Sequence, residues 1–494
     1  MEFEYRSRVC PGSPRCLFTG SEADAFIHTG TRRFLFTRES HAMLLLGLLV
    51  SAAALRPTLH FAHRSVSAPR CPSSVVSLSG EHEPAKALVH EPSQHELTVL
   101  DASAIVAGSV VGGGFLAVPL FTAPIGVLPS ATVFAATWGF LVLCGLAYTE
   151  AAAAVLANDE TGETGERASV LSVSRRYLGT PLATVLAVVF FLQMLIIATA
   201  NLVKAAELIG VVFPALPHGR SIVLLATIFG VFNLVATSRM MASVNTALTG
   251  TMCAGFLAFF VAVAAKSAPP ASAVLAHPQW RLLLPQAGWA VPLFVNTLRF
   301  GEAVPVVVGQ FGPRRLSKAR LAVVVGSLVP MLLAVGLSVA GRALSLAGMN
   351  RAIDPLIAFL QTPGLGAPIV LVSAGAIGST LLGVLLATSQ LLRDSFRLSS
   401  PRVLLGARAV VPIVIASLAC RSTGLYLRLL AFAGAFPSIV LYALLPPILA
   451  LAARRQTGGL ASGFEAVPGG RRTLRLLVLL ACGLLGVNAW LWLV

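Results

Sequence analysis

The sequence has 494 residues, of which 56% are hydrophobic and only 11% are charged, and its mean hydropathy is +0.83. This composition excludes a soluble fold of this length and indicates an all-α membrane protein with several spans, embedded in a lipid bilayer. The formal net charge of +16 does not indicate a nucleic-acid partner, because most Arg residues lie in short segments between apolar spans, where positive charge sets topology.

The first part of the chain, residues 1–94, has the composition of a targeting region rather than of a folded domain. Met43–Leu55 is an apolar stretch too short to span a bilayer, and it ends in small residues as signal sequences do. Residues 43–80 contain Arg and Ser but no Asp or Glu, which is typical of a transit peptide. We therefore expect a two-part sequence that directs the protein to a plastid membrane. The alternatives are a disordered cytosolic tail, with a plasma-membrane location, or a true start near Met43.

Residues 95–494 are expected to form one membrane domain of eleven helical spans. The basic residues favour a cytosolic-side N-terminus, since the loops on that side would hold seventeen Lys and Arg residues against seven on the other side. The seven cysteines are dispersed and have no ligand spacing, so no metal site or cofactor is predicted. The predicted spans are 98–122, 127–157, 181–211, 220–237, 241–265, 288–311, 320–342, 366–392, 403–420, 425–452 and 473–493.

The first span contains a predicted break. Gly112, Gly113 and Gly114 lie in its middle and Pro119 follows, and each glycine disfavours helix by roughly 0.8–1 kcal/mol relative to Ala. Unwound backbone within a bilayer persists only where it faces a cavity or a ligand. The break is therefore a candidate binding site. The alternative is that the glycines allow a neighbouring helix to approach closely.

The sixth span, Trp289–Phe311, is also interrupted, by Gly301 and then Pro305. Spans one and six occupy equivalent positions if the chain consists of two five-span inverted repeats followed by an eleventh helix. Paired interruptions of this kind indicate the binding site of an inverted-repeat transporter. The two discontinuous helices are then expected to meet near the middle of the membrane.

The chemistry of such a meeting point favours a zwitterionic substrate. The half-helix that begins near Gly114 and Phe115 would direct its N–H groups and its positive dipole end at a carboxylate. Carbonyl oxygens at the other ends of the breaks suit an ammonium group. The predicted substrate-binding residues are Ser109, Gly112, Gly113, Gly114, Phe115, Phe300 and Gly301.

Several motifs resemble the aromatic amino acid permeases, the tryptophan/tyrosine permease family of the amino acid-polyamine-organocation superfamily. The segment AGSVVGGGFLAVPLFTAPIG, Ala107–Gly126, is similar to the first span of that family. The resemblance implies a leucine-transporter-type fold and proton-coupled transport of tyrosine, tryptophan or phenylalanine. Further similarity lies at Glu150, Arg176–Gly179, Ala206–Leu208, Pro305, Gly375–Arg393 and Gly434–Pro437.

Two charged residues at the second break are candidates for coupling or substrate binding, because charge inside a bilayer costs about 2.5–3.5 kcal/mol on insertion scales. Glu302 stands where members of the family often carry His, and it can carry the coupled proton or hold the substrate ammonium. Arg299 can bind a substrate carboxylate. The alternative is an ion pair between these two side chains, which are three residues apart. Lys204 and Glu207 have the same spacing and are expected to form a structural pair.

Other functions remain open from sequence alone. Ser379 and Thr380 occupy a region of span eight where sodium-coupled relatives of the family place a cation site, so the resemblance also allows a sodium-coupled transporter of another neutral amino acid. The alternative is that these hydroxyls are ordinary helix-packing residues. Gln193, Asn201, Asn296 and Thr297 can contact the ligand, but we expect ordinary hydrogen bonds between helices. A membrane-embedded enzyme is the alternative of another class. It is disfavoured because the spans contain no HExxH or DxxD motif and no histidine, so no catalytic residue is predicted.

Overall fold

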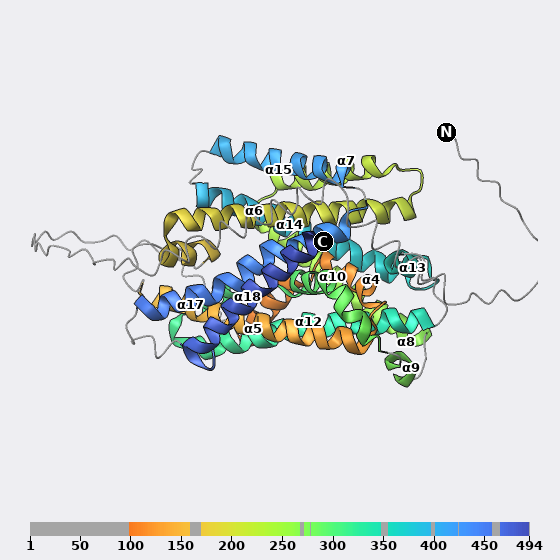
Figure 1. Ribbon diagram of the computed structural model, residues 1–494. Coiled ribbons are helices and arrows are strands. Elements are labelled where there is room, and N and C mark those ends of the chain that lie inside the picture. The colour runs from red at the N-terminus through yellow and green to blue at the C-terminus, as the bar shows by residue number, and fades with distance from the viewer. Residues whose placement is uncertain are drawn as a thin grey trace, which may run out of the picture.

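The computed structural model describes residues 98–158, 169–266, 271–276, 278–346, 354–396, 401–422, 424–456 and 465–493. Over these ranges the secondary structure is helical throughout, which confirms the predicted all-α class (Figure 1). The predicted targeting region, residues 1–94, lies outside the described residues.

Most helices run along one common direction, with short elements near both ends and in the centre (Figure 1). The elements η1 and η2 are 3₁₀ turns and η3 is a π-helix. In chain order the elements are α3 (Val99–Val110), η1 (Gly113–Ala117), α4 (Val118–Thr122), α5 (Val127–Asn158), α6 (Val170–Val212), α7 (His218–Val235), α8 (Ser238–Lys266), α9 (Ala271–Leu275), α10 (Trp280–Leu298), α11 (Val304–Phe311), η2 (Pro313–Arg315), α12 (Leu316–Leu346), α13 (Pro355–Gln361), α14 (Gly366–Phe396), α15 (Pro401–Arg421), α16 (Tyr426–Ala433), η3 (Gly434–Leu444), α17 (Leu445–Gln456) and α18 (Gly470–Leu493).

Each of the eleven predicted spans coincides with a helix or an interrupted helix. Among the described residues, eight helices are long and apolar enough to cross a bilayer, and the bent pair of α3 with η1 and α4 adds a ninth candidate. The remaining two predicted spans coincide with α10–α11 and with α15. Helix α6 begins earlier than the predicted span, at Val170, but Gly179 interrupts it with φ +78°. Glycine tolerates this positive φ, and the non-helical backbone at Gly179 separates the segment before it from the predicted span.

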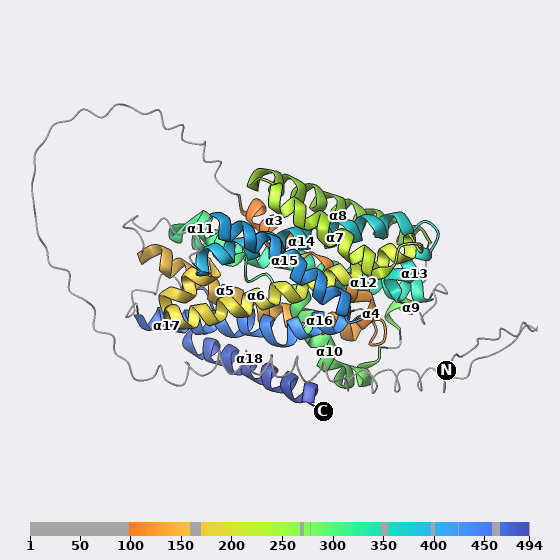
Figure 2. The same cartoon turned by 90° about the horizontal axis from the view of Figure 1, so that it is seen from above.

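The helices differ in how much of their surface the protein covers. The most apolar window of α5 is 78% buried and that of the α16–η3–α17 span is 83% buried, so both lie in the core. The corresponding windows of α7 and α18 are only 22% buried, which places apolar side chains where lipid would contact them. Helix α18 lies on the flank of the bundle (Figure 2).

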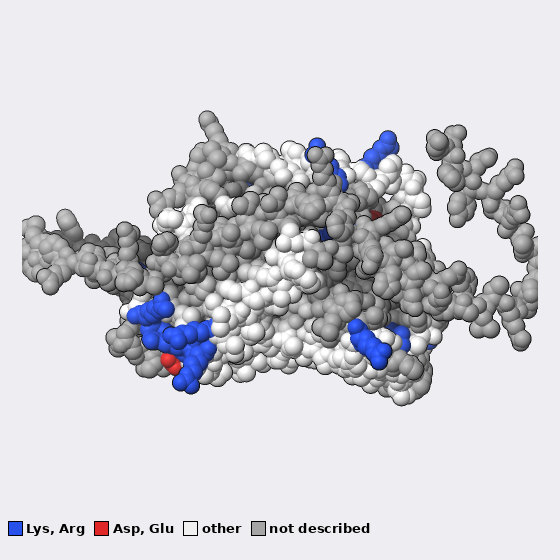
Figure 3. Space-filling view, viewed as in Figure 1, with Lys and Arg blue, Asp and Glu red and all other residues white. Residues whose placement is uncertain are grey.

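Basic side chains form a group at one end of the bundle. On the face shown in Figure 3, the largest group of Lys and Arg side chains lies at the end where α17 finishes and α18 begins. At that end Arg454 of α17 makes a two-pronged ion pair with Glu150 of α5, and both side chains are almost fully buried. The backbone N–H of Ala466 also donates to Glu150, over 3.2 Å. A buried carboxylate requires such partners, so this contact joins two core spans.

Span one is broken as predicted. Helix α3 ends at Val110, Gly112 is extended, and the chain resumes as η1 and α4 at an angle of 56° to α3. The glycine triplet removes the helical preference at this point, and Pro119 lies in the first turn of α4, where its missing N–H costs little.

Span six is interrupted as well. Helix α10 ends at Leu298, Arg299 is extended, and the chain passes through a turn before α11 begins at Val304. Pro305 lies in the first turn of α11, as Pro119 does in α4. Both discontinuities on which the transporter interpretation depends are therefore present in the structure.

A third irregularity, the π-helix η3, was not predicted. Gly434 at its start lies so close to α10 that an added Cβ would overlap the carbonyl group of Pro292. Pro437 lies inside the same segment and lacks a backbone N–H, which favours a departure from regular α-helical bonding. The tight approach of η3 to α10 places span ten directly behind the second break.

We expect Gly434→Ala to destabilise the protein by about 1–3 kcal/mol, the usual cost of overpacking a core. The detergent-solubilised variant should therefore melt at a lower temperature than the wild type. Gly483→Ala on α18 is the matched control, since no atom lies within 4 Å of its added Cβ. Equal melting temperatures for the two variants would contradict this account.

Candidate functional site

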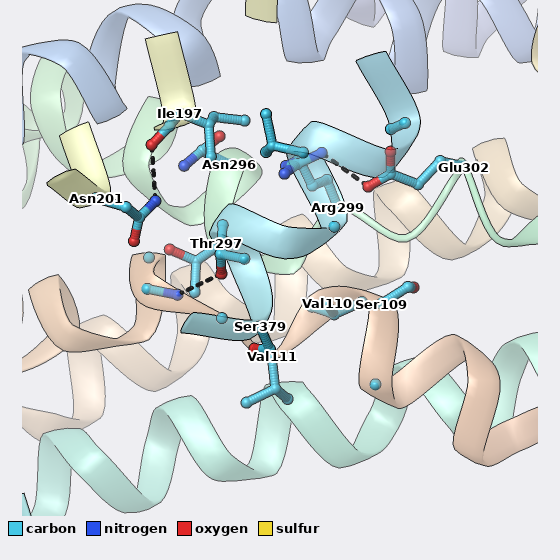
Figure 4. A pocket seen from close by; sticks show the side chains of 18 of the residues that line it. Ser109, Val110, Val111, Ile197, Asn201, Asn296, Thr297, Arg299, Glu302 and Ser379 are labelled. Atoms are coloured by element: carbon cyan, nitrogen blue, oxygen red, sulfur yellow. Dashed lines mark hydrogen bonds and ion pairs between the residues drawn. The ribbon is translucent and has the colours of Figure 1, made fainter. Parts of the chain in front are cut away.

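The two breaks line one cavity, of about 290 Å³, which lies between α3, α6, α8, α10, α14 and α16. This volume is close to the lower end of the range for small-molecule sites, about 300–1,000 Å³. Figure 4 shows side chains from both interrupted spans around the same space. The lining residues are Gly108, Ser109, Val110, Val111, Gly112, Gly113, Gly114, Met194, Ile197, Asn201, Asn245, Thr249, Asn296, Thr297, Arg299, Glu302, Ser379, Thr380, Gly383, Val384, Ala387 and Leu430.

The glycine triplet is packed tightly against two neighbouring helices. An added Cβ at Gly113 would overlap the side-chain amide of Asn201 on α6, and one at Gly112 would meet the hydroxyl of Thr380 on α14. Only Gly114 has room, with its nearest neighbours 3.8 Å away. Gly112 and Gly113 therefore allow α14 and α6 to approach the chain closely at the edge of the cavity. This is the alternative role that the sequence suggested for the glycines.

The peptide groups of Gly113 are held from both sides. Its N–H donates to Thr380 Oγ1 over 3.1 Å, and its carbonyl accepts a 2.7 Å hydrogen bond from the Tyr426 hydroxyl. We expected the N–H groups here to be available to a substrate carboxylate. The contact with Thr380 shows that one of them already has a partner, because α14 lies within hydrogen-bonding distance of the break.

Two buried amide oxygens at the cavity have no hydrogen-bond partner. Asn201 Nδ2 donates to the carbonyl of Ile197 over 2.8 Å, which leaves its Oδ1 without a donor. Asn296 Oδ1 is likewise buried and unpaired. A buried acceptor without a partner costs about 1–3 kcal/mol, so a ligand that supplies N–H donors at this place would recover that free energy.

Arg299 and Glu302 form the ion pair that the sequence suggested as an alternative. Arg299 Nη1 lies 2.9 Å from Glu302 Oε1, and the two side chains are 13% and 25% exposed, so they are only partly shielded from the cavity. Tyr442 of η3 contacts both. It accepts from Arg299 and donates to Glu302, each over 3.4 Å. The pair is visible beside the cavity in Figure 4.

The structure brings most, but not all, of the predicted residues to this cavity. Ser109, the three glycines, Arg299 and Glu302 line it, whereas Phe115, Phe300 and Gly301 do not. Phe115 is fully buried in the core. Phe300 packs where a side chain at Gly145 would be, and Gly301 lies against the ring of Tyr442. These three positions face neighbouring helices because the chain turns at each break.

Sequence reasoning missed several contributors. Tyr426 and Tyr442 contact the two breaks from span ten, and Met194, Asn245 and Thr249 line the cavity from α6 and α8. The available sign in the sequence was Gly434 followed closely by Pro437, which mark span ten as an irregular helix. Within the described part of the chain, no group of three or more His, Cys, Asp or Glu side chains is placed to hold a metal ion.

Comparison with known proteins gives one family and one fold. Residues 95–488 match the model of the Tryptophan/tyrosine permease family. The fold is similar to that of the Eremococcus coleocola manganese transporter in complex with an aromatic bis-isothiourea substituted compound, with a TM-score of 0.53, 14% identity, and coverage of 81% of this chain and 87% of that chain. For a mutant of the same transporter the TM-score is 0.52 and the identity is 13%, with coverage of 78% of this chain and 84% of that chain. A comparison with curated proteins finds no match.

Proposed function

The chain belongs to the tryptophan/tyrosine permease family, and on this premise we propose that it is a proton-coupled transporter of tyrosine, tryptophan or phenylalanine. The shared fold and the family indicate a transporter and not an enzyme. The observation that supports the proposal best is that both interrupted spans line one cavity. In our proposal the two breaks belong to two inverted five-span repeats, and substrate access alternates around them.

The cavity has groups for each part of an aromatic amino acid. The unpaired oxygens of Asn201 and Asn296 suit the three donors of an ammonium group. Arg299 suits the carboxylate, since guanidinium groups bind carboxylates in a two-pronged manner. The aromatic ring can pack against the buried apolar side chains of the cavity, which are Met194, Ile197, Val384 and Leu430.

Sodium coupling with another neutral amino acid is the second candidate. Ser379 and Thr380 line the cavity beside the first break. Both hydroxyls donate to the carbonyl of Ala376, over 3.2 and 2.7 Å. Ser379 therefore keeps its oxygen lone pairs for a cation, and Thr380, which also accepts from the Gly113 N–H, keeps one. Replacing sodium by choline in the uptake assay separates the two candidates, because only a sodium-coupled transporter would stop.

The proposal is tested by uptake into proteoliposomes that contain the purified protein. We expect labelled tyrosine, tryptophan or phenylalanine to accumulate inside the vesicles when the pH outside, where the substrate is added, is lower than the pH inside. This accumulation should disappear when an ionophore removes the pH gradient. Unlabelled aromatic amino acids should compete, and leucine should compete poorly. Equal competition by leucine would contradict the aromatic assignment, and gradient-independent accumulation would contradict proton coupling.

The substitution Asn296→Leu tests whether the Asn296 side chain binds the substrate or only stabilises the fold. Leucine has nearly the same shape, and replacing an unpaired buried polar group by an apolar one is close to neutral for stability. We therefore expect an unchanged or raised melting temperature, with substrate affinity lower by roughly tenfold, the effect of one lost hydrogen bond to a charged group. Unchanged affinity, measured by isothermal calorimetry, would exclude Asn296 as a ligand contact.

We also propose a plastid membrane as the location, on the composition of residues 1–94. Fused to a fluorescent protein in a cell that has plastids bounded by extra membranes, this segment should direct the fusion into the organelle. Replacing Arg56, Arg64 and Arg70 by glutamate should prevent entry, since transit peptides are poor in acidic residues. Fluorescence in the cytosol or at the plasma membrane would contradict the proposal.

A further inference from the structure

A buried cation lies on span three, away from the cavity. Lys204 of α6 is only 1% exposed, and its ammonium group lies 2.7 Å from Asp354 Oδ2 and 3.2 Å from Glu207 Oε2. The same group lies 5.3 Å from the ring centroid of Tyr426. A buried ammonium is stable only when it is paired, so these three partners define its position. We call Lys204, Glu207 and Asp354 the outer latch, because the topology predicted from the basic residues puts the end of span three and the segment after span seven on the outer side.

The outer latch holds a short helix of a connecting segment against the core. Asp354 is the N-cap of α13, and its Oδ1 accepts the N–H of Leu356 over 2.8 Å while its Oδ2 binds Lys204. One carboxylate therefore starts α13 and also fastens it to α6. Helix α13 packs on α14 and on α4, which is the half of span one that follows the break.

Tyr426 connects the latch to the first break. Its ring faces the ammonium group of Lys204, and its hydroxyl donates to the carbonyl of Gly113 over 2.7 Å. Tyr426 is 4% exposed. Because Gly113 lines the cavity, an unbroken series of polar contacts runs from α13 through Lys204 and Tyr426 to the cavity wall.

We propose that Tyr426 is a positioning residue for the substrate site, and that the outer latch sets its position. In this arrangement the docking of α13 and the shape of the break are coupled. When α13 leaves α6, Lys204 and the Tyr426 ring move together, and the Gly113 peptide loses the hydrogen bond that fixes it. The inference deepens the proposed transport function and rests on it, but the coupling itself can be measured without substrate.

Hydrogen–deuterium exchange of the full-length protein in detergent tests the coupling directly. Asp354→Asn keeps an N-cap side chain but removes the charge that binds Lys204. Amides in both 355–361, where Pro355 itself has none, and 113–117 should therefore exchange faster. Tyr426→Phe removes only the hydroxyl, so 113–117 alone should exchange faster, by roughly tenfold, as expected for one lost hydrogen bond. Faster exchange in Asp354→Asn that is confined to 355–361, or absent from both segments, would overturn the coupling.

Tyr148→Phe is the matched control, because the Tyr148 hydroxyl is also buried but has no hydrogen-bond partner. It should leave exchange in both segments unchanged. In the uptake assay, Tyr426→Phe should raise KM roughly tenfold with little change in the maximal rate, because the hydroxyl shapes the site and does not touch the substrate. An unchanged KM in a protein with faster exchange at 113–117 would overturn the positioning role. Failure of the wild type to transport any aromatic amino acid would instead refute the proposed function and leave the exchange result standing.

Discussion

Glu302→Gln should abolish the accumulation of substrate that a pH gradient drives, while the protein remains folded. Glutamine has the same shape and keeps a hydrogen-bond acceptor near Arg299, but it cannot bind and release a proton at neutral pH. A gradient of one pH unit corresponds to about 1.4 kcal/mol per proton, which supports roughly tenfold accumulation at a ratio of one proton to one substrate. The wild type should approach tenfold accumulation, whereas the variant should only equalise the substrate concentrations on the two sides of the membrane.

The reason for choosing Glu302 is its place in the structure. It lines the cavity and keeps one quarter of its surface exposed, so water and protons can reach it. Its partners Arg299 and Tyr442 are within hydrogen-bonding distance of its two oxygens. A proton on this carboxylate would weaken the ion pair with Arg299, and the guanidinium would then be available to the substrate carboxylate. Protonation and substrate binding would be linked through that exchange of partners.

Two controls make this result interpretable. Glu465→Gln removes a carboxylate that is half exposed and lies outside the cavity, so its accumulation should match the wild type. Exchange of labelled for unlabelled substrate at equal pH should persist in Glu302→Gln, which shows that the site still binds and moves its ligand. Accumulation at the wild-type level in Glu302→Gln would mean that another group carries the proton.

The sequence was sufficient to locate the interruptions of spans one and six, because glycine and proline act on the backbone of their own segment. The glycines at 112–114 and Pro305 disfavour regular helix whatever surrounds them. The assignment of Lys204 and Glu207 as a pair was correct for a related reason, since residues three apart lie on one helix face. The third member of that cluster, Asp354, is far away in sequence and could not be deduced from spacing.

What the sequence could not supply is the rotation of each helix about its own axis. Most spans have a high mean hydropathy and few charged residues, so their sequences give little indication of which side faces the cavity. For this reason Asn201 and Asn296 were expected to bond between helices, although each has an unpaired oxygen at the cavity. The same limit explains why Phe115 and Phe300, next to the breaks in sequence, face the core and not the cavity.

Gly113→Ala should reduce transport by about a hundredfold or more, although the change adds a single methyl group. Its Cβ would overlap the Asn201 side chain, which is fully buried and cannot rotate away without breaking its bond to Ile197. The overlap would also displace the Gly113 peptide from Thr380 and Tyr426. Overpacking alone costs about 1–3 kcal/mol. The loss of both hydrogen bonds adds to this cost, and the break is then misplaced relative to the substrate.

A second variant distinguishes local misplacement from general loss of packing. Asn201→Gly in the Gly113→Ala background removes the group that the methyl would meet, so it should restore the exchange protection of residues 113–117. It should not restore full affinity, because the amide oxygen proposed to bind the substrate ammonium is then missing. Gly139→Ala on α5, where an added Cβ meets nothing within 4 Å, should transport at the wild-type rate. Wild-type transport by Gly113→Ala would show that the break tolerates a side chain at its narrowest point, and the close contact with α6 would then have no part in substrate binding.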